Sequence, residues 1–152
     1  MSSFQPSLQP PDPPSSFQSS STAQGQVFAS QCDFLLEQNA FSLSERFVVS
    51  EVGVEIDRVA TSRRGLTYWF EYKGSIQGNR PGLRRTDTVK KAVANGALLK
   101  AVPTARPYIV LTSHLPETGA GRAMLDAALD LGYITDVICV YTPDHVTRLA
   151  HL

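Results

Sequence analysis

The segment Thr67–Lys73 limits the fold more than any other feature, because its residues alternate with the two-residue period of a β-strand. The side chains expected on one face are aromatic: Tyr68, Phe70 and Tyr72. The side chains expected on the opposite face are Thr67, Trp69, Glu71 and Lys73. The segment is therefore predicted to be a strand, and a strand requires a sheet around it.

The residues before this strand divide into a helix and one or two further strands. A helix is predicted over 27–38, where apolar side chains recur at helical spacing: Val27, Phe28, Cys32, Leu35 and Leu36. Residues 47–60 alternate as strands do, and residues 61–66 have the composition of a turn. The pattern predicts a hairpin that pairs the end of 47–60 with Thr67–Lys73.

Beyond Lys73 the pattern changes to helices that alternate with short strands. A loop rich in Gly, Pro and Arg spans 74–85, and a helix then begins at Thr86 as N-cap and ends before Pro103. Strands are predicted at 108–112 and 136–141, with a helix at 121–131 between them and a short helix after Thr142-Pro143. A meander followed by this alternation predicts an α/β fold with a mixed sheet flanked by helices.

The first 25 residues differ from the rest, because they contain eight Ser, five Pro and four Gln and a single charged residue. Such a composition cannot bury enough apolar surface to order a chain, so residues 1–25 are predicted to be a disordered tail and 26–152 the folded domain. The chain has two cysteines, no secretory leader pattern and no apolar stretch long enough for a membrane span. A cytoplasmic protein is expected.

The formal net charge is zero, but the charges are unevenly distributed along the chain. Between Arg58 and Arg106 there are eleven Lys or Arg residues and two acids, Glu71 and Asp87. A surface with this excess of positive charge attracts polyanions through counterion release. The simpler alternative is a solvated surface that happens to be basic.

The most informative spacing is Asp57 followed fourteen residues later by Glu71-Tyr72-Lys73. The hairpin places both acids at the ends of adjacent strands, and we expect Asp57, Glu71 and Lys73 to face a solvent-filled cleft opposite the aromatic face. Two neighbouring carboxylates repel each other unless a cation lies between them, and Mg²⁺ prefers oxygen ligands. The predicted ligands are Asp57, Glu71 and the backbone carbonyl of Tyr72, and Lys73 is predicted to orient the attacking water.

These residues and their order of elements resemble the PD-(D/E)XK nuclease superfamily, over residues 26 to about 142. The resemblance implies a restriction-endonuclease-like αβββαβ core and hydrolysis of DNA with Mg²⁺, or Mn²⁺ in its place, to leave a 5′-phosphate. It also implies that Asp57, Glu71 and Lys73 are the catalytic residues. The chain departs from the pattern at Ile56, where the motif has Pro. Many members carry a further Glu on the first helix, for which the candidates here are Glu37, Gln31 and Asp33.

Nucleic-acid contacts are predicted for residues of the loop and helix that follow Lys73. They are Ser75, Gln77, Arg80, Arg84, Arg85, Lys90 and Lys91. DNA is the expected partner, with a homodimer as an open alternative and no membrane. Two other functions remain open, an inactive nuclease-like module that binds nucleic acid and an unrelated α/β protein that binds a phosphorylated ligand. For the triplet itself, the alternative is a surface ion pair between Glu71 and Lys73 on a solvated strand face.

Overall fold

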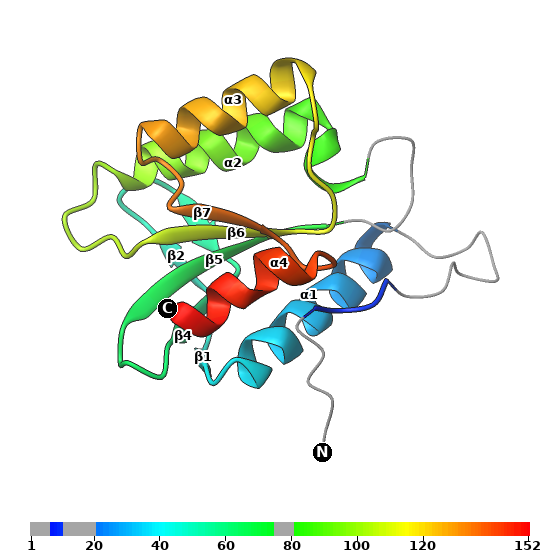
Figure 1. The fold of residues 1–152 in the computed structure, drawn as a ribbon. Coiled ribbons are helices and arrows are strands. Elements are labelled where there is room, and N and C mark those ends of the chain that lie inside the picture. Colours follow the sequence, from blue (N-terminus) through cyan, green and yellow to red (C-terminus); the bar gives the residue numbers. More distant parts are fainter. Residues whose placement is uncertain (1–6, 11–20, 75–80) are drawn as a thin grey trace.

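The computed structural model describes residues 7–10, 21–74 and 81–152 and shows a mixed α/β fold (Figure 1). The main sheet is built from β1 (Ser42–Ser44), β4 (Arg58–Thr61), β5 (Thr67–Lys73), β6 (Tyr108–Thr112) and β7 (Asp136–Cys139). These five strands lie in the order β1-β4-β5-β6-β7. The β1–β4 and β4–β5 pairs are antiparallel, whereas β6 runs parallel to both β5 and β7. The predicted mixed sheet flanked by helices is confirmed.

Helices cover both faces of this sheet (Figure 1). One face packs against α1 (Ser21–Gln38), α4 (Pro143–Val146) and the 3₁₀ helix η2 (Thr147–His151). The other face packs against α2 (Thr86–Leu99), α3 (Gly119–Asp130) and a separate hairpin of β2 (Phe47–Val49) and β3 (Val54–Ile56). The 3₁₀ turn η1 (Gly82–Arg84) leads into α2. No helix in the described ranges is long and apolar enough to cross a bilayer.

Strand β5 lies at the centre of the sheet and is buried on both faces. Tyr68 and Phe70 pack towards α1, where Phe41 meets Phe70 edge-on with ring centroids 5.5 Å apart. Trp69, on the other face, belongs to the core beneath α2 and α3 and meets Phe47 of β2 with ring centroids 5.3 Å apart. The expectation that one face of this strand is open to solvent is wrong, because the β2–β3 hairpin folds over it together with α2.

Most predicted elements are present, with shifted boundaries. The hairpin between β4 and β5 is confirmed, and its turn is closed by a bond from the Ser62 N–H to the Leu66 carbonyl at 2.8 Å. Helix α1 begins at Ser21 rather than Val27, α3 spans Gly119–Asp130 rather than 121–131, and β1 was not predicted. Part of the predicted tail is ordered, because the Leu8 N–H donates to the Val140 carbonyl at 3.0 Å. The rest of it, except the start of α1, lies outside the described residues.

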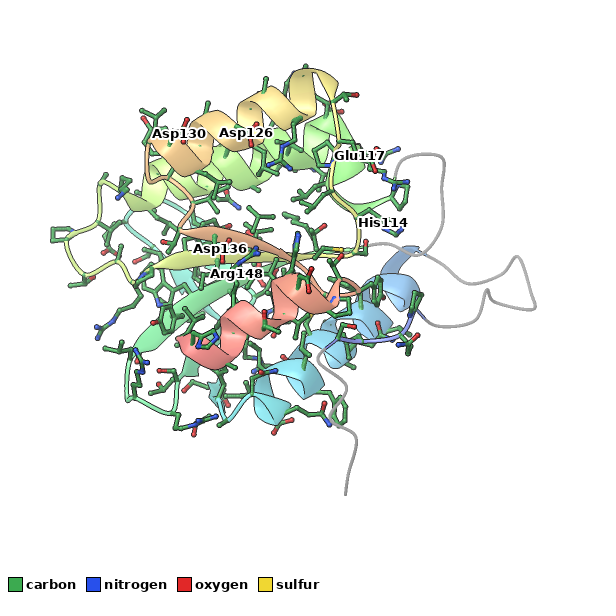
Figure 2. The ribbon with its side chains drawn as sticks, in the orientation of Figure 1. His114, Glu117, Asp126, Asp130, Asp136 and Arg148 are labelled. Carbon is green, nitrogen blue, oxygen red and sulfur yellow. The ribbon has the colours of Figure 1, made fainter. Side chains whose placement is uncertain are left out.

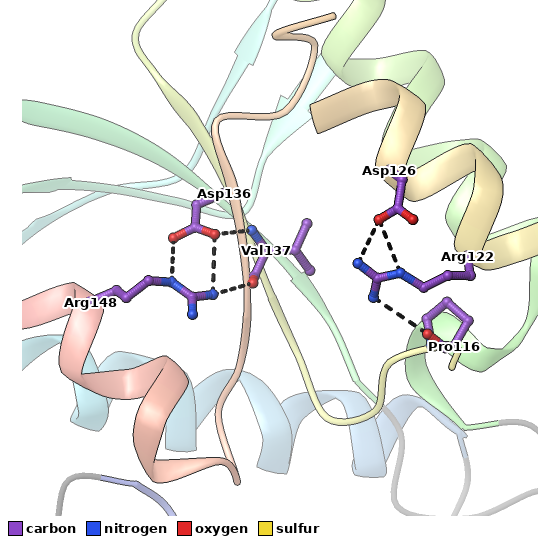
Figure 3. A network of polar contacts seen from close by, with 6 residues as sticks. All are labelled: Pro116, Arg122, Asp126, Asp136, Val137 and Arg148. Atoms are coloured by element: carbon purple, nitrogen blue, oxygen red, sulfur yellow. Dashed lines mark hydrogen bonds and ion pairs between the residues drawn. The ribbon is translucent and has the colours of Figure 1, made fainter. Parts of the chain in front are cut away.

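Strand β7 forms one edge of the sheet, and side chains occupy its outward backbone groups (Figure 3). The Val137 N–H donates to Asp136 Oδ1 at 2.8 Å, and Arg148 of η2 donates to the Val137 carbonyl at 2.9 Å. Arg148 also pairs with Asp136 at 2.9 Å, and Figure 2 shows the two side chains next to each other. Two residues on, the Cys139 N–H donates to His145 Nδ1 at 3.1 Å. These contacts remove the unpaired groups that make an exposed edge strand adhesive.

Helix α2 approaches the segment after α3 closely at Gly96. A Cβ at this position would collide with the backbone carbonyl of Tyr133, which cannot move aside as a flexible side chain would. The glycine therefore sets the distance between α2 and the segment that leads from α3 into β7.

We expect Gly96→Ala to lower the free energy of unfolding by about 1–3 kcal/mol, the usual cost of overpacking. Gly25 offers a matched control, since it also lies within a helix but nothing lies within 4 Å of a Cβ built there. Gly25→Ala should raise stability by up to about 1 kcal/mol, because alanine has the higher helix propensity. Urea unfolding of both variants tests this, and two changes of the same sign would contradict it.

Candidate active site

Asp57 lies at a bend between β3 and β4, where the chain leaves the small hairpin and enters the main sheet. The last ladder pair of β4 and β5 is Arg58 with Phe70, so the next step of the register sets Asp57 opposite Glu71. Asp57 Oδ2 accepts a hydrogen bond from the Tyr72 N–H at 2.8 Å. The bend and this bond hold the carboxylate beside the end of β5.

Glu71 is buried within the sheet, with 3% of its surface exposed. Its Oε2 atom accepts hydrogen bonds from the Tyr108 hydroxyl at 2.5 Å and from Asn95 Nδ2 at 3.0 Å. The Asp57 carboxyl group is close enough to raise the pKa of Glu71 through its charge. Donors from α2 and β6 and an acid from the β3–β4 bend therefore meet at one carboxyl group.

Lys73 places its Nζ atom 3.7 Å from Glu71 Oε1, and its side chain is 21% exposed. The structure thus brings together the three residues predicted from the sequence. It differs in their surroundings, because Glu71 does not face a solvent-filled cleft. The ion pair expected under the alternative is present, but its setting is not a solvated strand face, since the side chain of Glu71 is only 5% exposed.

Burial raises the pKa of Glu71 from 4.5 to about 7, and the hydrogen bond and negative charge of Asp57 add to the rise. Lys73 and the Tyr108 hydroxyl act in the opposite direction. The pKa of Tyr108 is itself raised, first by burial and then by the charge of Glu71, so the phenol stays a neutral donor. Near neutral pH Glu71 is therefore protonated part of the time, and a bound divalent cation would displace that proton.

The oxygen atoms at this point suit a small hard cation. Both carboxylates are available, and the Tyr72 carbonyl lies on the same edge of β5 as its N–H, which faces Asp57. Within residues 7–10, 21–74 and 81–152 no group of three or more His, Cys, Asp or Glu side chains is close enough to bind a metal. A bound Mg²⁺ would therefore complete its shell with water, as Mg²⁺ commonly does.

The first helix does not add an acid to the site. Asp33 accepts hydrogen bonds from Arg58 at 2.9 and 2.7 Å and from the Tyr72 hydroxyl at 2.6 Å. Gln31 accepts a bond from the Tyr141 hydroxyl at 2.8 Å, and Glu37 is exposed. Helix α1 covers the face of β5 that carries Phe70, whereas Glu71 projects from the other face.

The predicted nucleic-acid contacts fall into two groups. Ser75, Gln77 and Arg80 lie outside the described residues. Four are exposed, at or near the start of α2: Arg84, Arg85, Lys90 and Lys91. Lys91 precedes Asn95 by one helical turn, so it lies on the side of α2 that reaches Glu71, whereas Lys90 lies about 100° further round.

The sequence did not single out Asn95 and Tyr108 as part of the site. Asn95 is a half-buried polar residue in a helix whose neighbours are mostly apolar, and Tyr108 opens a buried strand with a hydroxyl that requires a partner. These two features are the sequence signals that could have marked Asn95 and Tyr108 as residues with a buried polar partner. Nothing in the spacing indicates that both side chains reach Glu71, which lies 24 and 37 residues away.

A concave region of about 360 Å³ lies at the amino end of β6, and Tyr108 is among the residues that line it. It is lined by residues that include Lys100, Arg106, Tyr133 and Thr135. This groove faces the C-terminal ends of α2 and α3, whose dipoles repel anions, and the amino ends of the parallel strands. Ligands of open α/β sheets bind outside the carboxyl ends of strands, which is where Lys73 lies.

Comparison with known proteins adds no identification: no model of a protein family, no curated protein and no solved structure matches this chain. The residues of the site are therefore the basis for any functional argument.

The raised pKa of Glu71 predicts a pH-dependent stability. The folded protein binds a proton at Glu71 that the unfolded chain releases near 4.5, so stability should fall as pH rises from about 5 to 8. The loss attributable to Glu71 is up to roughly 3 kcal/mol. His114 and His145 act in the opposite direction, because burial lowers the pKa of each.

Urea unfolding at a series of pH values in EDTA would isolate the contribution of Glu71. The difference in the free energy of unfolding between the parent and Glu71→Gln should change with pH, since glutamine keeps the hydrogen-bond acceptor but cannot ionise. Asp130→Asn, which removes an exposed carboxylate, is the control and should leave the pH profile unchanged. Parallel profiles for the parent and Glu71→Gln would show that Glu71 titrates normally.

Proposed function

We propose that this chain is a Mg²⁺-dependent nuclease of the PD-(D/E)XK type that hydrolyses phosphodiester bonds in DNA. The observation that carries the proposal is the convergence of Asp57, Glu71 and Lys73 from a bend and a neighbouring strand of one sheet. A buried carboxyl group with a second one beside it is costly to a fold, and such groups are commonly retained for chemistry.

Each residue of the site has a distinct role in this reaction. Asp57, Glu71 and the Tyr72 carbonyl would hold Mg²⁺, which supplies positive charge for the phosphate and lowers the pKa of a bound water. Lys73, at 3.7 Å from Glu71, orients the attacking water and offsets the charge that develops on the phosphate. The reaction needs no covalent bond to the protein.

The arrangement of elements supports the same proposal. A helix precedes three antiparallel strands, β1, β4 and β5, and a crossover through α2 then leads to β6, parallel to β5. Apart from the inserted β2–β3 hairpin, this order agrees with the αβββαβ order expected of a restriction-endonuclease-like core and so supports the proposal. The exposed cations at the start of α2 lie on the side of the sheet to which Glu71 projects, where a DNA backbone would bind.

One observation favours a second candidate, a module of the same architecture that binds nucleic acid without cutting it. Among the residues that the structure describes, the site has two acids and receives none from α1. A site with two carboxylates binds a divalent cation less tightly than one with three. In this second candidate the basic surface binds nucleic acid, and Asp57 and Glu71 take no part in catalysis.

The replacement of Lys73 separates these readings. Lys73→Ala should remove most plasmid cleavage while Mg²⁺ binding persists, because an ammonium group is not a metal ligand. Lys73→Arg should restore little activity, since a planar guanidinium does not occupy the place of a compact charge. Asp57→Ala should abolish both cleavage and metal binding.

Cleavage of supercoiled plasmid and calorimetric titration with Mg²⁺ provide the two measurements. Lys100→Ala removes an exposed lysine at the C-cap of α2, outside the proposed site; it is the control and should cleave normally. Wild-type cleavage by Lys73→Ala would refute the nuclease assignment. If the parent protein binds duplex DNA but neither binds Mg²⁺ nor cleaves DNA, the result would support the second candidate, a module that binds nucleic acid without cutting it.

The two adjacent lysines of α2 should contribute unequally to DNA affinity. Lys91 lies on the side of α2 that reaches Glu71, so Lys91→Ala should weaken binding and reduce the slope of log affinity against log salt by about 0.9. Lys90→Ala has the same change of charge and should have a smaller effect. Equal losses would show that only the total charge of the helix matters.

A further inference from the structure

The two oxygens of Glu71 have different surroundings. Oε2 accepts two hydrogen bonds, from the Tyr108 hydroxyl at 2.5 Å and from Asn95 Nδ2 at 3.0 Å. Oε1 has Lys73 at 3.7 Å, which is an ion pair rather than a short hydrogen bond. Oε2 is therefore held by two hydrogen bonds, whereas Oε1 has only the longer ion pair with Lys73.

The two donors are held by rigid parts of the fold. Tyr108 is buried in the first position of β6, in register with Trp69, and its N–H donates to Thr135 Oγ1 at 3.3 Å. Its carbonyl accepts a bond from the Thr135 N–H at 2.7 Å. Asn95 projects from α2 at the border between its buried face, which carries Ala92 and Gly96, and its exposed face. Rotation of the Glu71 carboxylate would therefore break its bonds to both donors.

Occupation of Oε2 restricts how Glu71 can bind a cation. A carboxylate with one free oxygen binds a metal through that oxygen alone. Mg²⁺ is small and takes near-ideal octahedral geometry with single oxygens at about 2.0–2.1 Å. Ca²⁺ is larger, takes about 6–8 oxygens and readily accepts both oxygens of one carboxylate.

We propose that Asn95 and Tyr108 are positioning residues that select a small octahedral cation, Mg²⁺ or Mn²⁺, over Ca²⁺ by holding Glu71 Oε2. The inference rests on the proposed function, and it names the cation class that the site admits. Neither side chain touches the metal. Both act through the orientation of Glu71, in the way that outer hydrogen bonds tune other metal sites.

Titration of the full chain with Mg²⁺ and Ca²⁺, each alone, tests the proposal on the parent, Tyr108→Phe and Asn95→Ala. Loss of either donor should lower Mg²⁺ affinity by roughly tenfold or more. Ca²⁺ affinity should stay level or rise, because Oε2 then keeps only one of its two hydrogen bonds and can turn towards a larger cation. The ratio of the two affinities should therefore shift towards Ca²⁺ by at least about tenfold in both variants.

Tyr141→Phe is the matched control, since it removes a phenol that bonds Gln31 on the other side of the sheet. It should leave the ratio unchanged. Circular dichroism verifies folding, and Asn95→Ala retains the test if Tyr108→Phe unfolds, because Asn95 is half-exposed on a helix and alanine favours helix.

Equal losses for Mg²⁺ and Ca²⁺, or no change in either, would overturn the selection role while the parent still binds Mg²⁺ and cleaves DNA. A parent that binds no divalent cation would overturn the proposed function together with this inference. The two failures are distinguished by the parent protein alone.

Discussion

The burial of one carboxyl group at the centre of the sheet is the constraint on which the other features of the site depend. Transfer of an ionised carboxylate from water costs several kcal/mol unless partners replace the water. The fold supplies those partners from three elements, namely β6 through Tyr108, α2 through Asn95 and β5 itself through Lys73. A second carboxyl group, Asp57, lies close by and makes the burial less favourable. A hydrophobic residue at position 71 would stabilise the sheet more simply, and this cost is the reason that the proposed function gives Glu71 a chemical role.

The position of Asp57 shows how local backbone geometry creates the site. A straight strand through residues 54–61 would direct alternate side chains to fixed faces. The bend at Asp57 instead divides the segment, so that β3 pairs with β2 above the sheet and β4 pairs with β5 within it. The same division covers Trp69 and Glu71 with the small hairpin. One bend therefore places the carboxylate of Asp57 beside β5 and also contributes to the burial of Glu71.

Much of the fold was predictable because it depends on local patterns. The alternation in Thr67–Lys73, the turn at 61–66 and the helical spacing in α2 each appear within a few residues. The placement of Asp57 opposite Glu71 follows from the hairpin that this turn makes. Strand β1, by contrast, is the short segment Ser42–Ser44 and has no pattern of its own. The burial of Glu71 was not predictable either, because it results from elements distant in the sequence that close over β5. For the same reason the contacts of Asn95 and Tyr108 appear only in three dimensions.

The two edges of the sheet are unequal, and this limits how the molecule can associate. On the β7 edge, Asp136 and His145 accept bonds from the Val137 and Cys139 N–H groups, and Arg148 donates to the Val137 carbonyl. On β1, the Arg58 guanidinium donates to the Ser44 carbonyl at 2.7 Å. A strand from a second copy that added at β7 would have to displace three side chains from the backbone groups it needs. Extension of the sheet from copy to copy is therefore opposed at the β7 edge.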